Sequence, residues 1–302
     1  MTLEVDIGGV TLKNPVIAAS GTFGYGLDYK DMVDLDRLGG IVIKGLSLFP
    51  STGNPEPRVA ETPAGLLNAV GLENIGIERF VSDKLPALKK VDTNIFLNIY
   101  GKRAQEYARL ASVIDTLDGI SGIEVNISCP NVEKGGAAFG TDPDQAFRVV
   151  RKVRQATGKF VMVKLSPNVT DITRVAASVE KAGADAVSLI NTLTGLAVDA
   201  DTARPMLSNV TGGLSGPAVK PVALRMVYET ARAVTIPVVG LGGIMTARDA
   251  AEFIIAGASA VQVGTATLTD PGSMIRIIDG LEKFRSKKGV SRISDIRGSL
   301  KV

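Results

Sequence analysis

The chain has 302 residues, 45% hydrophobic and 22% charged, and its 34 basic and 31 acidic residues leave a net charge of +3. This composition is typical of a globular protein with a large core, and the 5% content of aromatic residues with no long basic run argues against nucleic-acid binding. The lack of histidine excludes Ser-His, Cys-His and histidine-ligated metal chemistry. The single cysteine, Cys129, excludes an internal disulfide and an iron–sulfur cluster held by this chain alone.

No basic leader precedes Glu4 and Asp6, and no apolar run reaches the roughly 18 residues of a membrane span. We therefore expect a cytoplasmic protein. Residues 3–5 and 10–12, around Gly8 and Gly9, predict a small hairpin that could close the bottom of a barrel. Eight mostly apolar runs follow, each typical of a parallel strand covered on both faces. They are residues 16–19, 40–44, 94–100, 122–127, 160–165, 186–190, 237–240 and 260–263.

The segments between these strands repeat apolar residues at the i, i+3, i+4 and i+7 spacing of an amphipathic helix. The predicted apolar faces are 107/110/111/114, 146/149/150/153, 172/175/176/179, 224/227/228/231, 250/253/254/257 and 274/277/278/281. Expected helix starts are Asp142-Pro143, Asp270-Pro271 and the pair Thr246 and Asp249. Alternating strands and helices predict a single (β/α)8 TIM barrel over residues 1–302, with an N-terminal hairpin and active-site loop insertions. An open doubly wound sheet is the alternative.

Barrel enzymes carry their active sites at the C-terminal ends of the strands. The residues predicted there bear amide, hydroxyl and ammonium groups and almost no carboxylates, a set that suits an anionic, electron-rich ligand. They are Ser20, Gly21, Lys44, Gly45, Asn98, Asn126, Cys129, Lys164, Asn191, Thr192, Gly242, Gly243, Gly264 and Thr265.

Glycines after the last two strands predict a phosphate site. Gly242 and Gly243 precede a helix start at Thr246, and Gly264 follows the next strand. Glycine permits close backbone approach, and amides at a helix start attract phosphate. The alternative is that these glycines only form tight turns. Because the chain has no G-x-G-x-x-G motif, it offers no evident NAD site of its own.

Three side chains are candidates for chemistry. Lys44 and Lys164 each end an apolar strand, where an unpaired ammonium is costly to bury. Each lysine could neutralise a carboxylate, stabilise a flavin that gains negative charge, form a Schiff base, or simply reach the surface. Cys129 lies just beyond a strand end and is the most plausible proton acceptor in a chain without histidine; the alternative is an inert core cysteine.

Several motifs resemble those of class 1 dihydroorotate dehydrogenases over essentially the whole chain. They are NPVIAASG (14–21), GNPEPR (53–58), NAVGLEN (68–74), NISCPN (126–131), Asn191-Thr192, Gly242-Gly243-Ile244 and Gly264-Thr265. The resemblance implies an FMN-binding barrel that oxidises dihydroorotate to orotate in pyrimidine synthesis. It also implies that Cys129 removes the C5 proton while the C6 hydride passes to the flavin N5.

The same resemblance implies roles for the other candidates. Lys44 would contact both the flavin and the substrate carboxylate, and Lys164 would lie by the flavin's N1–C2=O edge, where reduction places negative charge. The substrate would be held by Lys44, Asn68, Ala69, Val70, Gly71, Leu72, Asn126, Asn191 and Thr192. The flavin would be held by Ser20, Lys44, Gly45, Asn98, Asn126, Lys164 and Ile190, and its phosphate by Gly216, Gly242, Gly243, Gly264 and Thr265.

The loop at residues 68–72 resembles the NAD-linked class 1B catalytic subunit more than the fumarate-linked class 1A homodimer. Class 1B implies a second subunit with FAD and a 2Fe-2S cluster, and a heterotetramer built on two catalytic chains. The alternatives are a class 1A enzyme, another pyrimidine-reducing flavoenzyme such as the pyrimidine-reducing domain of dihydropyrimidine dehydrogenase, a Lys164 Schiff-base aldolase, and a non-catalytic FMN protein.

Overall fold

Eight parallel strands close into a barrel in the computed structural model, which describes residues 2–128 and 139–302. The strands are β3 (Val16–Ala18), β4 (Gly40–Leu46), β7 (Asn94–Ile99), β8 (Gly122–Asn126), β9 (Phe160–Lys164), β10 (Ala186–Leu189), β15 (Val238–Leu241) and β16 (Ala260–Val263). Each strand pairs with the next along the chain, and β16 returns to pair with β3. All eight expected strands are present, so the TIM barrel is confirmed and the open sheet is wrong.

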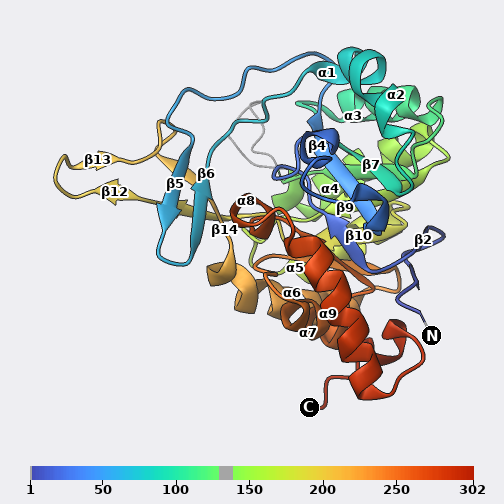
Figure 1. The fold of residues 1–302 in the computed structure, drawn as a ribbon. Helices are drawn as coiled ribbons and strands as arrows, with labels where there is room; N and C mark the ends of the chain where they lie inside the picture. Colours follow the sequence, from blue (N-terminus) through green and yellow to red (C-terminus); the bar gives the residue numbers. More distant parts are fainter. Residues whose placement is uncertain (1, 129–138) are drawn as a thin grey trace.

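Helices follow most strands and pack around the barrel (Figure 1). The longer helices are α3 (Ala104–Asp115), α4 (Pro143–Ala156), α5 (Ile172–Lys181), α6 (Lys220–Ala233), α7 (Ala247–Ala256) and α9 (Ser273–Lys288). Single-turn helices are α1 (Gly76–Arg79), α2 (Leu85–Leu88) and α8 (Ala266–Thr269), with the π-helix η3 (Phe80–Lys84) between the first two. The 3-10 turns are η1 (Leu27–Tyr29), η2 (Leu35–Arg37), η4 (Phe139–Thr141), η5 (Pro217–Val219) and η6 (Ile293–Ile296). None of the helices in the described residues is both long enough and apolar enough to cross a bilayer.

The predicted apolar faces are the buried ones in α3, α4 and α5. The prediction for α6 is wrong. Its buried residues are Ala223, Met226, Val227 and Thr230. The i, i+3, i+4, i+7 spacing fits this helix in two neighbouring registers. The register that the structure buries contains Thr230, so a prediction from hydrophobicity alone chooses the neighbouring register, which has no threonine. Tyr228, expected inside, instead lies 3.7 Å from the guanidinium of Arg232.

Helix starts follow the predicted caps at two of three places. The Asp142 carboxylate accepts hydrogen bonds from the amides of Asp144 and Gln145 at the start of α4. Thr246 and Asp249 form a capping box on α7. The third prediction is wrong, because α9 begins at Ser273 rather than at Pro271. The carboxylate of Asp270 instead accepts a hydrogen bond from Gly272 in the turn before that helix.

The N-terminal hairpin consists of β1 (Val5–Asp6) and β2 (Thr11–Leu12). Its tip lies against the N-terminal ends of two barrel strands. A Cβ on Gly8, whose φ is +102°, would lie 2.6 Å from the carbonyl oxygen of Asp185, just before β10, and 3.5 Å from the ring of Phe160 at the start of β9. The hairpin therefore packs on the bottom of the barrel, as the sequence predicts.

A second sheet, which the sequence analysis does not predict, is built from the insertions that follow β4 and β10 (Figure 1). Its order is β11 (Leu193–Leu196), β14 (Thr211–Ser215), β6 (Gly65–Asn68) and β5 (Val59–Thr62), and a hairpin of β12 (Val198–Asp199) and β13 (Arg204–Pro205) extends from it. A small apolar cluster of Ala60, Leu67 and Leu207 supports the sheet. The insertions leave the barrel at the ends of β4 and β10, so the sheet stands beside its C-terminal mouth.

Candidate active site

A fully buried carboxylate lies among the predicted site residues at the C-terminal part of the barrel. Oε2 of Glu124, on β8, accepts hydrogen bonds from Nδ2 of Asn98 at 2.6 Å and from Oγ of Ser20 at 3.4 Å. Nζ of Lys164, on β9, lies 4.0 Å from the same oxygen and donates to Ser20 Oγ at 3.2 Å. The structure thus brings Ser20, Asn98 and Lys164 together around a residue that sequence reasoning missed.

The other carboxylate oxygen of Glu124 is held by side chains from two further strands, β10 and β16. Oε1 accepts hydrogen bonds from Oγ of Ser188 at 2.9 Å and from Nε2 of Gln262 at 2.7 Å. Glu124, Ser188 and Gln262 each stand inside an otherwise apolar strand, and each is 0% exposed. A polar side chain inside such a run is the signal that predicts this cluster, because a buried polar group needs partners.

The residues expected to bind a pyrimidine also form a connected group. Nδ2 of Asn191 lies 3.5 Å from Oδ1 of Asn126, and the Asn191 side chain accepts a hydrogen bond from the amide of Thr192 at 2.8 Å. Asn68, on β6, donates to the carbonyl of Gly213 at 3.3 Å. A Cβ on Gly213 would lie 2.0 Å from Oγ1 of Thr192, so the glycine at this position lets Thr192 approach the strand that carries the Asn68 contact.

The predicted substrate loop, Ala69 to Leu72, is tied to its surroundings through its backbone. The Ala69 amide donates to the Arg58 carbonyl at 2.8 Å, and the Val70 carbonyl accepts from the Asn54 amide at 3.0 Å. The Leu72 carbonyl accepts from the hydroxyl of Tyr100 at 2.9 Å, which joins the loop to the end of β7. A Cβ on Gly71 would lie 2.5 Å from Cγ of the Asn54 side chain. The Glu56–Pro57 peptide bond beside this loop is cis.

Lys44 lies near the end of β4, where the pairing with β7 shifts register between Ile43 and Leu46. Its amide donates to the carbonyl of Gly24 at 2.7 Å, and its side chain is half-buried. Within the described residues, no carboxylate forms an ion pair with its ammonium. A Cβ on the next residue, Gly45, would lie 2.9 Å from Oδ1 of Asn98, so β4 approaches the Glu124 cluster closely.

The residues predicted to hold a phosphate converge on one place. A Cβ on Gly243 would lie 2.8 Å from the carbonyl oxygen of Gly216, and a Cβ on Gly216 would lie 3.5 Å from Cγ2 of Thr265. The amides of Gly243, Gly264 and Thr265 donate no hydrogen bond to another residue of the described chain. Such unpaired amides in a glycine-rich cradle suit an anionic oxygen cluster.

Two further residues complete this region. A Cβ on Gly242 would lie 3.2 Å from Cγ1 of Ile190, whose amide donates to the carbonyl of Leu241 at 2.9 Å. A Cβ on Gly264 would make only ordinary contacts, the nearest at 3.6 Å to Cβ of Ala19. A methyl group at Gly264 would thus fit without displacing any atom of the described residues.

The start of α7 carries a carboxylate of its own. The carboxylate of Asp249 accepts hydrogen bonds from the amides of Met245 and Thr246, at 3.1 and 2.8 Å, so these two amides are already paired. Burial raises the pKa of Asp249, but hydrogen bonds from Lys220, Thr246 and these amides outweigh it and hold the pKa below its usual range. For Lys220 the signs are reversed. Burial lowers its pKa, but the hydrogen bonds to Asp249 and Glu252 outweigh this effect and hold the pKa above its usual range.

Cys129 lies outside the described residues, and Ser128 is the described residue immediately before it. The Ser128 amide donates to Oδ1 of Asn126 at 3.1 Å, and its hydroxyl donates to the carbonyl of Lys164 at 3.1 Å. The chain therefore leaves β8 toward Cys129 from a point fixed between Asn126 and Lys164.

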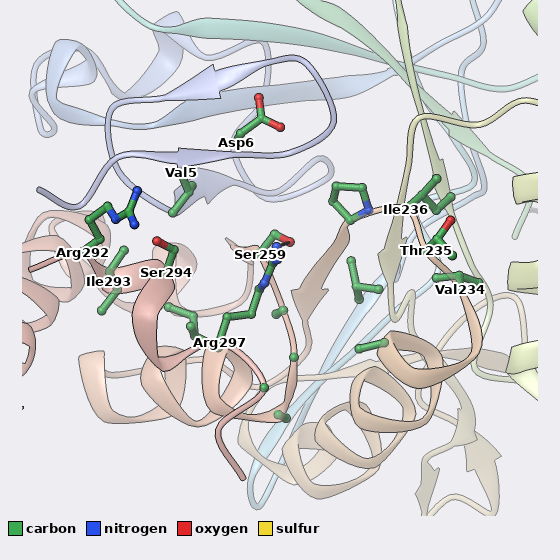
Figure 2. Close-up of a pocket in the computed structure, with 18 of the residues that line it drawn as sticks. Val5, Asp6, Val234, Thr235, Ile236, Ser259, Arg292, Ile293, Ser294 and Arg297 are labelled. Carbon is green, nitrogen blue, oxygen red and sulfur yellow. Dashed lines mark hydrogen bonds between the residues drawn. The ribbon is translucent and has the colours of Figure 1, made fainter. Parts of the chain in front are cut away.

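A cavity of about 920 Å³ lies at the opposite end of the barrel. Its walls come from the N-terminal hairpin, the segments before β15 and β16, and the segment after α9 (Figure 2). Figure 2 shows Arg297 extended toward Ser259, to which it donates a hydrogen bond at 2.9 Å. None of the predicted site residues is among the described residues that line this cavity. Since barrel enzymes work at the other end, we assign the active site to the Glu124 region.

The sequence comparisons agree with this geometry. The family model described as dihydroorotate dehydrogenase matches residues 2–284. Proteins named dihydroorotate dehydrogenase B (NAD(+)), catalytic subunit, are similar along nearly their whole length. The protein of Geotalea daltonii is 54% identical over 300 residues, and that of Geobacter sulfurreducens is 55% identical over 300 residues; each alignment covers 99% of this chain and 98% of the relative. The chain therefore belongs to the dihydroorotate dehydrogenase family.

Proposed function

We propose that this chain is the catalytic subunit of an NAD-linked, class 1B dihydroorotate dehydrogenase, which oxidises dihydroorotate to orotate in pyrimidine synthesis. The similarity to class 1B catalytic subunits supports the substrate and the subclass. The observation that carries the proposal in the structure is the placement of Lys164, Asn98 and Ser20 around one buried carboxylate inside the barrel. Residues 1–302 form one FMN-binding barrel in this proposal.

The residues present fit FMN. Unpaired amides at Gly243, Gly264 and Thr265 suit its phosphate, together with Gly216 and Gly242. Ser20, Lys44, Gly45, Asn98, Asn126, Lys164 and Ile190 would hold the rest of the cofactor. When bound, FMN supplies a two-electron acceptor for the hydride that leaves C6 of the substrate.

The chain's own residues supply binding and proton transfer. Lys44, whose half-buried ammonium forms no ion pair with a carboxylate of the described residues, pairs with the substrate carboxylate, as the family resemblance implies. The pyrimidine is held by the amide-bearing and loop residues Asn68, Ala69, Val70, Gly71, Leu72, Asn126, Asn191 and Thr192. Cys129 accepts the C5 proton through its sulfur, so that loss of this proton and of the C6 hydride forms the C5=C6 double bond. Ser128 anchors the chain next to that base.

A partner subunit completes the reaction. The relatives are named catalytic subunits of NAD-linked enzymes, and this chain has one cysteine and no G-x-G-x-x-G motif. In the proposed assembly, electrons leave through a second subunit with FAD and a 2Fe-2S cluster, and two catalytic chains pair within a heterotetramer. A cytoplasmic location stays a prediction of the sequence.

The Lys164 Schiff-base aldolase is disfavoured by a specific contact. A Schiff-base lysine attacks as a free amine. Lys164 instead lies 4.0 Å from the Glu124 carboxylate and donates a hydrogen bond to Ser20. These contacts suit a lysine that serves as a fixed positive charge.

Steady-state oxidation of dihydroorotate by the purified FMN-loaded chain tests the proposal. We expect turnover with an artificial dye as acceptor and none with NAD until the second subunit is added. Efficient turnover with fumarate as acceptor would show that the chain is a class 1A enzyme and not a class 1B catalytic subunit. Reduction of NAD by the isolated chain would overturn the need for a partner, and no oxidation with any acceptor would overturn the proposed substrate.

A further inference from the structure

Glu124 is a fully buried ionisable residue for which the proposed reaction has no step. It sits on β8 with a hydrogen-bond donor from each of four other elements: Ser20 after β3, Asn98 on β7, Ser188 on β10 and Gln262 on β16. All four donors are neutral. Among the described residues, the charged group in contact with Glu124 is the ammonium of Lys164 on β9.

A buried charge is stable only when it is compensated. Lys164 is 5% exposed and Glu124 is 0% exposed, so solvent compensates neither group well. Four hydrogen bonds to the carboxylate stabilise its negative charge, since each donor presents a positive hydrogen to it. The same carboxylate then serves as the fixed counter-charge for the ammonium 4.0 Å away. Ser20, which contacts both groups, limits the positions that Lys164 can adopt.

We propose that Glu124 is a positioning residue for dihydroorotate oxidation, which keeps the ammonium of Lys164 charged and in place for the bound flavin. This inference rests on the proposed function. Glu124 acts through Lys164, whose positive charge favours the reduced, electron-rich flavin. Without Glu124, the ammonium enclosed in the barrel has no counter-charge among the described residues.

Two simple roles of Glu124 predict opposite effects on the flavin potential. If Glu124 were only a negative charge near the cofactor, its removal would make the flavin easier to reduce and raise the midpoint potential. If Glu124 maintains the charge of Lys164, the loss of Glu124 also removes the positive charge of Lys164, which in this proposal lies nearer to the flavin than Glu124 does. The midpoint potential then falls. The variant Glu124→Gln separates them, because the amide has the same shape. If the side-chain amide of Gln262 turns over, its Oε1, which is buried without a partner in the described structure, can accept from the new N–H group.

The first measurement is the midpoint potential of bound FMN against pH, by dye-coupled reduction without dihydroorotate. For Glu124→Gln we expect a fall equivalent to at least about tenfold in the reduction equilibrium, about 30 mV for a two-electron couple, and a steeper pH dependence than in wild type, whose flavin already takes up a proton on reduction. Ser188→Ala is the matched control, because it removes one hydrogen bond to Oε1 and keeps the charge. It should lower stability and leave the slope of the potential against pH as in wild type. An unchanged or raised potential in Glu124→Gln would overturn the proposal.

The second measurement needs no flavin. A buried, hydrogen-bonded lysine ammonium exchanges its protons slowly enough to give a ¹H–¹⁵N signal, which Lys164→Met would assign in the apo chain. We expect this signal in wild type at neutral pH and its loss in Glu124→Gln. Its absence from wild type, or its persistence in the variant, would overturn the inference even if the variant potentials cannot be measured. Failure of wild type to bind FMN would count against the proposed function and leave this apo result decisive for Glu124.

Discussion

Thr265 donates a hydrogen bond from Oγ1 to Oγ of Ser215 at 2.9 Å. This contact joins the loop after β16 to the end of β14, and Gly216 follows at once. It therefore ties the barrel to the inserted sheet at the place where we propose that the FMN phosphate binds. The inserted sheet is thus part of the site's framework, since it also carries Asn68 on β6.

Gly264→Ala should weaken FMN binding by about tenfold or more, about 1.4 kcal/mol, without lowering thermal stability. The added methyl group has only ordinary contacts with the described residues, and the backbone at Gly264 does not adopt a left-handed conformation. The methyl group would instead occupy the space proposed for the phosphate. Gly158→Ala, just before β9, where an added Cβ also makes only ordinary contact, is the control and should leave both quantities unchanged. Equal FMN affinity in the Gly264 variant, measured by fluorescence titration, would move the phosphate elsewhere.

Lys44→Met should raise the KM for dihydroorotate by about 10- to 100-fold and slow flavin reduction. Methionine keeps the apolar stem and loses a hydrogen bond to a charged group, which contributes about 1.5–3 kcal/mol. Stopped-flow reduction over a range of substrate concentrations measures both effects. Lys90→Met, which removes an exposed lysine before β7, provides the charge-matched control. Unchanged kinetics in the Lys44 variant would exclude Lys44 from the site.

Cys129→Ala should retain FMN and yet be reduced by dihydroorotate about 10²- to 10⁴-fold more slowly, the usual contribution of a positioned general base. The flavin spectrum of the oxidised variant checks that the site is intact. Cys129→Ser retains a weaker proton acceptor at the same position. At high pH we therefore expect it to be reduced faster than the alanine variant and more slowly than wild type. Reduction of the alanine variant at nearly the wild-type rate would assign the C5 proton to another group.

Acid should reveal the cap of α7. The pKa of Asp249 is lowered in the folded chain, so its contribution is present above the unfolded carboxyl value of about 3.9 and is lost as the pH falls through the lower folded value. Asp249→Asn should therefore cost about 1 kcal/mol of unfolding free energy at neutral pH and progressively less below about pH 4. Urea unfolding at several pH values measures this difference, with the exposed Asp118→Asn as control. A difference that stays constant down to about pH 2 would contradict the assigned role.

Much of the barrel follows from local sequence patterns. The eight strands are short apolar runs, and α3, α4 and α5 each have one continuous apolar face, so period and burial agree. The prediction for α6 is wrong because two adjacent registers fit the helical spacing and the more hydrophobic one was expected inside, whereas the barrel buries the one that contains Thr230. The inserted sheet was not predicted because its strands are short and glycine-rich. Its pairing is also distant in sequence, since Asn68 on β6 pairs with Gly213 on β14 and the barrel strands β7, β8, β9 and β10 lie between them in the chain.

In the candidate site, too, some residues could be predicted from local sequence and others depend on contacts between distant strands. Strand ends mark Lys44, Lys164 and the glycines, because the fold class alone fixes which end of each strand faces the site. Glu124 lies within a strand, and its partners Ser188 and Gln262 come from strands that are 64 and 138 residues away in sequence. The cluster depends on inward-facing positions meeting across the closed barrel, which local periodicity does not encode. The capping box of Thr246 and Asp249 on α7 was predictable, by contrast, because its two residues lie three positions apart in the chain.

The most direct test of the central claim is an anaerobic visible spectrum of the purified, FMN-loaded chain before and after addition of dihydroorotate. We predict a flavin absorbance that bleaches promptly, which would establish cofactor, substrate and the reductive half-reaction together. A chain that binds FMN and stays oxidised would contradict dihydroorotate as the substrate. A chain that binds no FMN at all would contradict the cofactor site at Gly243, Gly264 and Thr265.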